Sequence, residues 1–193
     1  RSRPRVLDGV QEIMYAVSGR GTLLVDGGSH ELEPGTAAYL QAEESYEVEN
    51  PGPETLLIVS ATAPQANGAA PQGGRRTVRY ADQPSLPASG DREFRYLVTA
   101  EVGCKDLTQF FGVIAPGRAP EHSHVYDEVI YVLDGEGALH TDDRDEPVAP
   151  GSCIHLPSFL VHSLENSGDS PMRIVAVFHP AGDPASRAYE ANQ

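Results

Sequence analysis

The sequence predicts an all-β protein built from two similar units, and two observations support this prediction. Sixteen prolines and 19 glycines separate short runs of β-branched and aromatic residues, a composition typical of many strands joined by tight turns. The chain also repeats itself without gaps at an offset of 116 residues, which is the separation of Glu12 and Glu128. Helix is therefore expected to be scarce. The repeat pairs Glu12 with Glu128, Tyr15 with Tyr131, Gly19 with Gly135, Gly21 with Gly137, Pro34 with Pro150, Gly35 with Gly151 and Asn50 with Asn166.

The first unit is predicted to span residues 1–62. A strand over 12–21 ends in a glycine turn, a second over 22–28 leads into a hairpin, and a third over 36–40 follows Pro and Gly. The repeat begins very close to the first residue of the chain. We therefore expect this unit to be truncated, or its preceding strand to be supplied by another part of the chain.

The remaining chain is predicted to hold a linker, a second unit and a tail. Residues 63–76 are rich in small residues, glycine and proline, which predicts a linker with a mobile middle. The second unit is predicted over 77–182, and the polar tail over 183–193 contains a stretch, 185–191, that suits a short helix. Strands of the second unit are expected over 77–81, 92–98, 107–114, 129–133, 152–156 and 171–179.

Four residues of the second unit form a pattern that suits a divalent metal. His122 and His124 are two residues apart, so in an extended segment both imidazoles point to the same side. Glu128 begins the strand that follows, and His162 comes after a further strand and a short loop. Nitrogen and oxygen donors of this kind favour Fe, Mn, Ni or Zn over Ca or Mg. We expect one divalent transition metal here.

This pattern resembles the two sequence motifs of the cupin superfamily. The first motif runs from Gly117 through the three ligands to Gly135 and is nearly complete, with one residue fewer between its first glycine and first histidine. The second, from Pro150 to Asn166 through His162, is looser. The resemblance implies two tandem cupin barrels, each a double-stranded β-helix of jelly-roll type, with the metal in the C-terminal barrel.

The first barrel differs from the second where the ligands would lie. The offset of 116 residues places Val6, Asp8, Glu12 and Tyr46 at the positions of His122, His124, Glu128 and His162, respectively. Only the carboxylate is therefore kept. We therefore expect the first barrel to hold no metal. A two-carboxylate site for a hard cation is the alternative.

Five further residues are candidates for the pocket or the surroundings of the ligands. Tyr126 lies between the ligands, Arg118 precedes them, and His155 lies on the strand that leads to the last ligand. Phe110 and Phe159 are candidates for the apolar wall. No catalytic residue can be assigned from the sequence.

Charge and apolar patterning restrict the partners. The formal net charge is −14, from 28 acidic and 14 basic residues, which disfavours nucleic acid and anionic membrane surfaces. No apolar run approaches 18 residues, and the basic residues 1–5 are not followed by the apolar core of a signal peptide. Two cysteines without CxxC spacing do not suggest a secreted disulfide scaffold. We expect a cytoplasmic protein that binds a small molecule and forms a homodimer.

Two classes of function remain open. An octahedral ion with four protein ligands keeps two positions for substrate or dioxygen, which favours a metal-dependent enzyme resembling dioxygenases. The alternative is a non-catalytic module that binds a metal or small ligand. The arrangement is also similar to the ureidoglycine aminohydrolases, manganese bicupins whose ligand pattern has a His where this chain has Glu128, and isomerase chemistry would suit the same site. Oxalate decarboxylases are less similar, because both of their barrels carry ligands.

Overall fold

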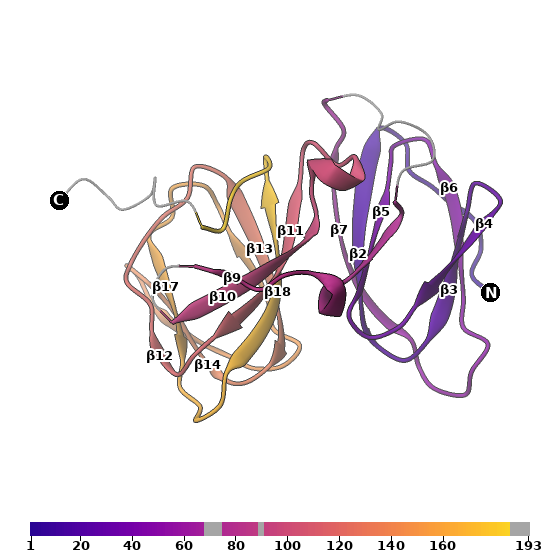
Figure 1. Cartoon of the computed structure of the whole chain (residues 1–193). Helices are drawn as coiled ribbons and strands as arrows, with labels where there is room; N and C mark the ends of the chain where they lie inside the picture. Colours follow the sequence, from indigo (N-terminus) through magenta and orange to yellow (C-terminus); the bar gives the residue numbers. More distant parts are fainter. Residues whose placement is uncertain (68–74, 89–90, 186–193) are drawn as a thin grey trace. The chain divides into compact units, whose positions relative to one another are not determined.

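The computed structural model describes residues 1–67, 75–88 and 91–185 (Figure 1). The regular structure of these residues consists of strands, apart from two single-turn 3-10 helices, η1 (Tyr80–Asp82) and η2 (Ala100–Val102). The prediction of an all-β protein is therefore confirmed. None of the helices in the described part of the chain has the length and apolar character needed to cross a membrane.

The first group of strands forms two four-stranded sheets, with orders β1-β6-β3-β4 and β7-β2-β5-β8. Neighbouring strands in both sheets are antiparallel. The strands are β1 (Arg5–Val6), β2 (Val10–Ser18), β3 (Gly21–Val25), β4 (Gly28–Leu32), β5 (Thr36–Leu40), β6 (Ser45–Glu49), β7 (Leu57–Pro64) and β8 (Thr77–Arg79).

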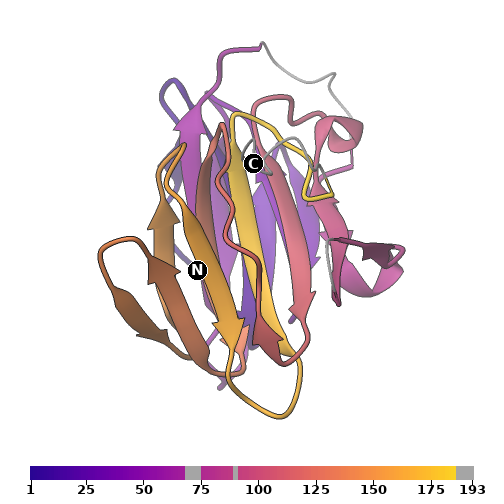
Figure 2. The same cartoon turned by 90° about the vertical axis from the view of Figure 1, so that its left-hand side faces the viewer.

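The second group forms a six-stranded sheet, β16-β13-β18-β11-β10-β9, and a four-stranded sheet, β12-β17-β14-β15. In the larger sheet β18, drawn in yellow, lies between β13 and β11 (Figure 2). The strands are β9 (Leu86–Pro87), β10 (Arg92–Val98), β11 (Thr108–Ile114), β12 (Gly117–Arg118), β13 (Asp127–Asp134), β14 (Gly137–Thr141), β15 (Asp145–Val148), β16 (Cys153–Leu156), β17 (His162–Asn166) and β18 (Met172–His179).

The chain packs as two units whose limits differ from the predicted ones. Unit 1 contains Arg1–Gln83 and Leu97–Leu107, and unit 2 contains Pro84–Tyr96 and the chain from Thr108 onward. The predicted second barrel began at residue 77, but β8 pairs with β5 and so belongs to unit 1. Half of the predicted linker, residues 68–74, and most of the predicted tail helix lie outside the described residues.

The internal repeat is confirmed by the pairing of the strands. The order β5-β2-β7 in unit 1 corresponds to β16-β13-β18 in unit 2, and β1-β6-β3-β4 corresponds to β12-β17-β14-β15. The register even shifts at equivalent points, between Ala16 and Ser18 on β2 and between Val132 and Asp134 on β13. Each unit therefore has the same two-sheet arrangement.

Two of the repeated glycines have the same physical role in both units. Gly19 and Gly135 have φ of 76° and 90°, a left-handed conformation that favours glycine. A Cβ atom at Gly19 would lie 2.3 Å from the Thr55 carbonyl oxygen, and one at Gly135 would lie 2.8 Å from the Met172 Cα. The turns that follow β2 and β13 therefore require glycine for both conformation and space.

Each unit has its own apolar core. Buried residues from the two sheets of a unit face each other, which is the packing expected when strands alternate between an inward and an outward side. The core of unit 1 contains Leu7, Met14, Ala16, Leu23, Val25, Leu32, Ala38, Leu40 and Tyr46. The core of unit 2 contains Phe94, Phe110, Ile114, Tyr126, Ile130, Val132, Leu139, Val148, Leu156, Leu164, Met172, Ile174, Ala176 and Phe178.

Candidate metal centre

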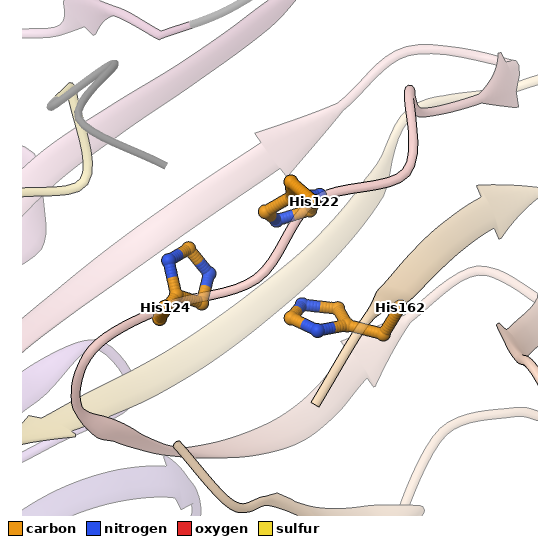
Figure 3. A group of neighbouring side chains, drawn as sticks. All are labelled: His122, His124 and His162. Atoms are coloured by element: carbon orange, nitrogen blue, oxygen red, sulfur yellow. The ribbon is translucent and has the colours of Figure 1, made fainter. Parts of the chain in front are cut away.

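Three histidines of unit 2 turn their rings toward one another (Figure 3). His122 and His124 lie on the segment between β12 and β13, and His162 is the first residue of β17. The backbones of His122 and His162 exchange two hydrogen bonds, of 3.0 and 2.9 Å. This short bridge fixes the segment against β17 and therefore fixes the distance between the imidazoles.

The ring nitrogens form a group that can hold a metal ion, because one nitrogen from each ring lies within 4.8 Å of the others. The Glu128 carboxylate, buried at the start of β13, joins this group: its Oε2 lies 3.3 Å from His124 Nε2 and 3.9 Å from His162 Nε2. The structure thus brings together all four residues that the sequence predicted as ligands.

Backbone carbonyls orient two of the imidazoles. His122 Nδ1 lies 3.0 Å from the Pro120 carbonyl oxygen, and His162 Nδ1 lies 2.9 Å from that of Leu160. A carbonyl oxygen only accepts, so Nδ1 carries the proton in each ring. A neutral ring then presents Nε2 as a lone pair, which is the state that ligates a metal.

Burial favours this neutral state. Desolvation, assisted by repulsion from His162, lowers the pKa of His122 to about 4. Desolvation also lowers the pKa of His162. Both rings are therefore neutral near pH 7, so a metal ion need not displace a proton from Nε2 of either ring there.

Aromatic neighbours hold the third imidazole. The Tyr126 ring stacks on the His124 ring with a centroid distance of 5.1 Å and an angle of 11°, and Phe178 contacts the same ring at 5.4 Å. Gly182 lies behind Tyr126, where an added Cβ atom would come within 2.4 Å of the tyrosine ring. Tyr126 therefore supports the predicted ligand His124 from behind and lies in the surroundings of the ligands.

Imidazole nitrogens and one carboxylate suit iron, manganese, nickel or zinc, which all accept this donor set. The donor chemistry and the fixed Nδ1 protons therefore fit a divalent transition metal.

A cavity of about 170 Å³ opens beside the imidazoles. Phe110 is part of its wall, as predicted from the sequence, and so are Phe94, Ile130 and Phe178. Arg92 on β10 also lines the cavity, although no sequence pattern had indicated it. Arg92 lies far from the metal motif in the sequence, and only the pairing of β10 with β11 brings it to this wall.

Of the five residues predicted for the pocket or its surroundings, Phe110 alone lines the cavity; Tyr126 packs on His124 instead, and the other three lie at the surface. Phe159 is 69% exposed, and its backbone takes a left-handed conformation with φ of 66°. His155 faces solvent 3.6 Å from the Asp127 carboxylate. Arg118 lies on the outside, where it forms an ion pair of 3.2 Å with Glu121. These residues are corrections to the predicted pocket.

Comparison with known proteins agrees with the repeated architecture. The family model described as Cupin domain matches residues 3–62 and again residues 110–178, one match in each unit. The chain belongs to the cupin family. The two matches together cover more than half of its length, and the paired sheets show that it is a bicupin.

Sequence relatives cover part of this cupin. The oxalate-binding protein of Thermotoga maritima is 28% identical over 91 residues, which span 46% of this chain and 75% of the relative. SchB of Streptomyces halstedii is 30% identical over 106 residues, which span 54% of this chain and 75% of the relative. In both cases the alignment is far shorter than the two-barrel chain.

A solved structure shows the same fold along nearly the whole chain. The oxalate decarboxylase of Bacillus subtilis matches with a TM-score of 0.71 at 13% identity, over 93% of this cupin and 66% of the decarboxylase. At this identity the similarity concerns the fold alone.

In unit 1 of this cupin, the position of Glu128 is occupied by Glu12, which is fully buried. The Tyr46 hydroxyl donates a 2.8 Å hydrogen bond to Glu12 Oε2, and Arg5 Nη1 lies 3.8 Å from Oε1. The Arg5 guanidinium also lies 5.6 Å from the centre of the Tyr46 ring. The carboxylate of unit 1 is therefore surrounded by a phenol and a guanidinium, where unit 2 has imidazoles.

Proposed function

We propose that this cupin is a metal-dependent enzyme that acts on a small organic molecule in its C-terminal barrel, with chemistry of the dioxygenase type. His122, His124, Glu128 and His162 are the proposed ligands of one divalent transition metal. The observation that carries the proposal is the convergence of these four donors on one cavity, with two imidazoles oriented by backbone carbonyls.

The residues of the chain have distinct roles in this proposal. Four protein donors leave two further positions on an octahedral ion, and a redox-active ion supplies electrons for reactions with dioxygen. The stacked ring of Tyr126 and the tilted ring of Phe178 keep His124 in place, so the donors are organised before the ion arrives. The apolar wall around Phe110 limits the water that surrounds a bound substrate.

A second candidate function is the binding of a small ligand without catalysis. It is favoured by the relative named oxalate-binding protein, 75% of which is covered by the alignment. In this case the same donors bind the metal, and the ion only serves to hold the ligand.

Metal content is the first test. The full chain is purified without added metal or chelator and analysed by elemental mass spectrometry, beside His124→Ala and the matched control His155→Ala. His155 is exposed and outside the cavity, so its removal should leave metal content unchanged. We expect near-stoichiometric iron, manganese or nickel in the wild type and in the control, and loss of metal in His124→Ala.

Oxygen uptake separates the two candidate functions. The metal-loaded protein is supplied with enediols, flavonoids and thiols while dissolved oxygen is recorded. Uptake that disappears in His124→Ala supports the enzyme, and full metal occupancy without uptake supports the binding module. Full metal occupancy in His124→Ala would contradict the ligand assignment.

A further inference from the structure

The cavity beside the proposed metal centre has a cationic side chain in its wall. Arg92, on β10, is half-buried and lines the cavity together with the three histidines and Glu128. Its Nη2 donates a 2.9 Å hydrogen bond to the Leu164 carbonyl oxygen on β17. This bond ties the guanidinium to the strand that begins with His162, so the cation is held at the site.

The charge of Arg92 acts on the donors of the centre. Burial lowers the pKa of Arg92, whereas attraction to the Glu128 carboxylate raises it. The same cation contributes to the lowered pKa of His162. A guanidinium beside a cation-binding centre opposes cation binding, so its position is more easily explained by a ligand of negative charge.

The charges of the loaded centre add up to an excess of positive charge. A divalent ion contributes two positive charges and Arg92 one, while the imidazoles are neutral when they ligate and Glu128 contributes one negative charge. The resulting charge of about +2 contrasts with the formal charge of −14 for the whole chain. The cavity is therefore a local cationic site in an anionic protein.

Two further acidic residues lie along the cavity, but both are exposed at its edge. Glu93 accepts a 2.8 Å hydrogen bond from the Ser85 hydroxyl, and Glu121 forms its ion pair with Arg118. Their charges are screened by solvent and by these neighbours, unlike that of the buried Glu128. They do not remove the excess of positive charge at the centre.

We propose that the ligand of this cavity is a small carboxylate anion, which binds the metal and is recognised by Arg92. This inference rests on the proposed metal centre and names its substrate class. The planar guanidinium matches the geometry of a carboxylate and forms strong charge-assisted hydrogen bonds with it. A cavity of about 150 Å³ accommodates benzene. The cavity of about 170 Å³ therefore suits an anion of at most roughly ten non-hydrogen atoms.

The test uses the full-length chain loaded with Mn(II), with anion binding measured by isothermal titration calorimetry. The probes are oxalate and benzoate, each compared with its neutral amide, oxamide or benzamide. The variants are Arg92→Gln, Arg92→Lys and a matched control, Arg173→Gln. Arg173 is on β18 of the same unit and pairs with Asp134 at the surface, outside the cavity.

We expect at least one of the two carboxylates to bind the wild type more tightly than its amide does. Arg92→Gln should weaken this binding at least about thirtyfold, as expected for a buried charge partner, Arg92→Lys should restore part of it, and Arg173→Gln should bind like the wild type. Mn(II) affinity should stay equal or rise in Arg92→Gln, since a repelling cation is gone. A merely structural defect would lower the affinity for both the metal and the anion.

The outcomes separate this inference from the proposed function. If Mn(II) binds but Arg92→Gln keeps the anion affinity of the wild type, the role of Arg92 is refuted while the metal centre stands. The same holds if neither carboxylate binds, or if the amides bind equally well. A wild type that takes up no Mn(II), iron, nickel or zinc would refute the metal centre and the inference with it.

Discussion

Acid should destabilise the metal-free protein through the buried imidazole of His122. The folded state lowers the pKa of this residue to about 4, whereas an unfolded chain has the ordinary value near 6.5. Between these values the unfolded state binds a proton that the folded state does not, so stability falls as pH falls. With 1.36 kcal/mol per pH unit, the loss from neutral pH to about pH 4.5 is about 2.5 kcal/mol.

Chemical unfolding of the chelator-treated protein measures this loss. Urea curves are recorded at about pH 7.5 and about pH 4.5 by tyrosine fluorescence and circular dichroism, for the wild type and for His122→Gln. Because carboxylates also titrate in this range, the informative quantity is the difference between the two proteins. His30→Gln, on β4 of unit 1, is the matched control for the loss of one histidine outside the metal centre.

The result that would refute the reasoning is an equal loss of stability in the wild type and His122→Gln. Such a result would mean that the folded protein binds the proton at His122 as readily as the unfolded chain does. Saturating metal should suppress the loss in the wild type, because ligation keeps the imidazole neutral.

Two other predictions concern residues around the buried carboxylates. Gly182→Ala should weaken metal binding about 10- to 100-fold, because the added methyl group displaces the Tyr126 ring that supports a ligand; Gly52→Ala, with no neighbouring atom closer than 3.7 Å, should leave metal binding unchanged. Tyr46→Phe should destabilise unit 1 by about 1.5–3 kcal/mol, because Glu12 loses a buried hydrogen bond. Metal content, measured in the same samples, should not change in Tyr46→Phe, and unchanged unfolding would contradict that role.

Most of the fold and the four donors could be predicted from the spacing of residues along the sequence. The glycine turns follow from residues close together in the sequence, and the equivalence of Glu12 and Glu128 follows from the internal repeat, which the structure shows in both units. The two imidazoles on one extended segment likewise follow from their separation of two residues. Such features depend on the local chain, which a single sequence contains in full.

The features that the sequence did not reveal depend on which side of a sheet a residue faces. Leu156 lies opposite Glu128 in the strand pair and is buried, so its neighbour His155 must face solvent. A shift of one residue in the strand register would exchange the buried and the exposed side chains of this strand. Arg92 reaches the cavity through sheet pairing between distant strands, and Phe159 leaves it through a backbone conformation that non-glycine residues seldom adopt.

Each unit buries a carboxylate at the same position, and the groups that surround this carboxylate differ between the two units. Glu12 and Glu128 occupy equivalent positions and are 0% and 5% exposed, and a buried carboxylate is costly unless a cation or a donor accompanies it. In unit 1 the Tyr46 hydroxyl and the Arg5 guanidinium accompany it from within the chain. In unit 2 the Nε2 atoms of His124 and His162 lie beside Glu128 and offer lone pairs, and the Arg92 guanidinium contributes a positive charge. No ligating nitrogen accompanies Glu12 among these groups of unit 1, whereas the imidazole lone pairs beside Glu128 can share a cation with the carboxylate. The proposed metal centre of unit 2 therefore differs from the equivalent position of unit 1 by its nitrogen donors, with the carboxylate kept.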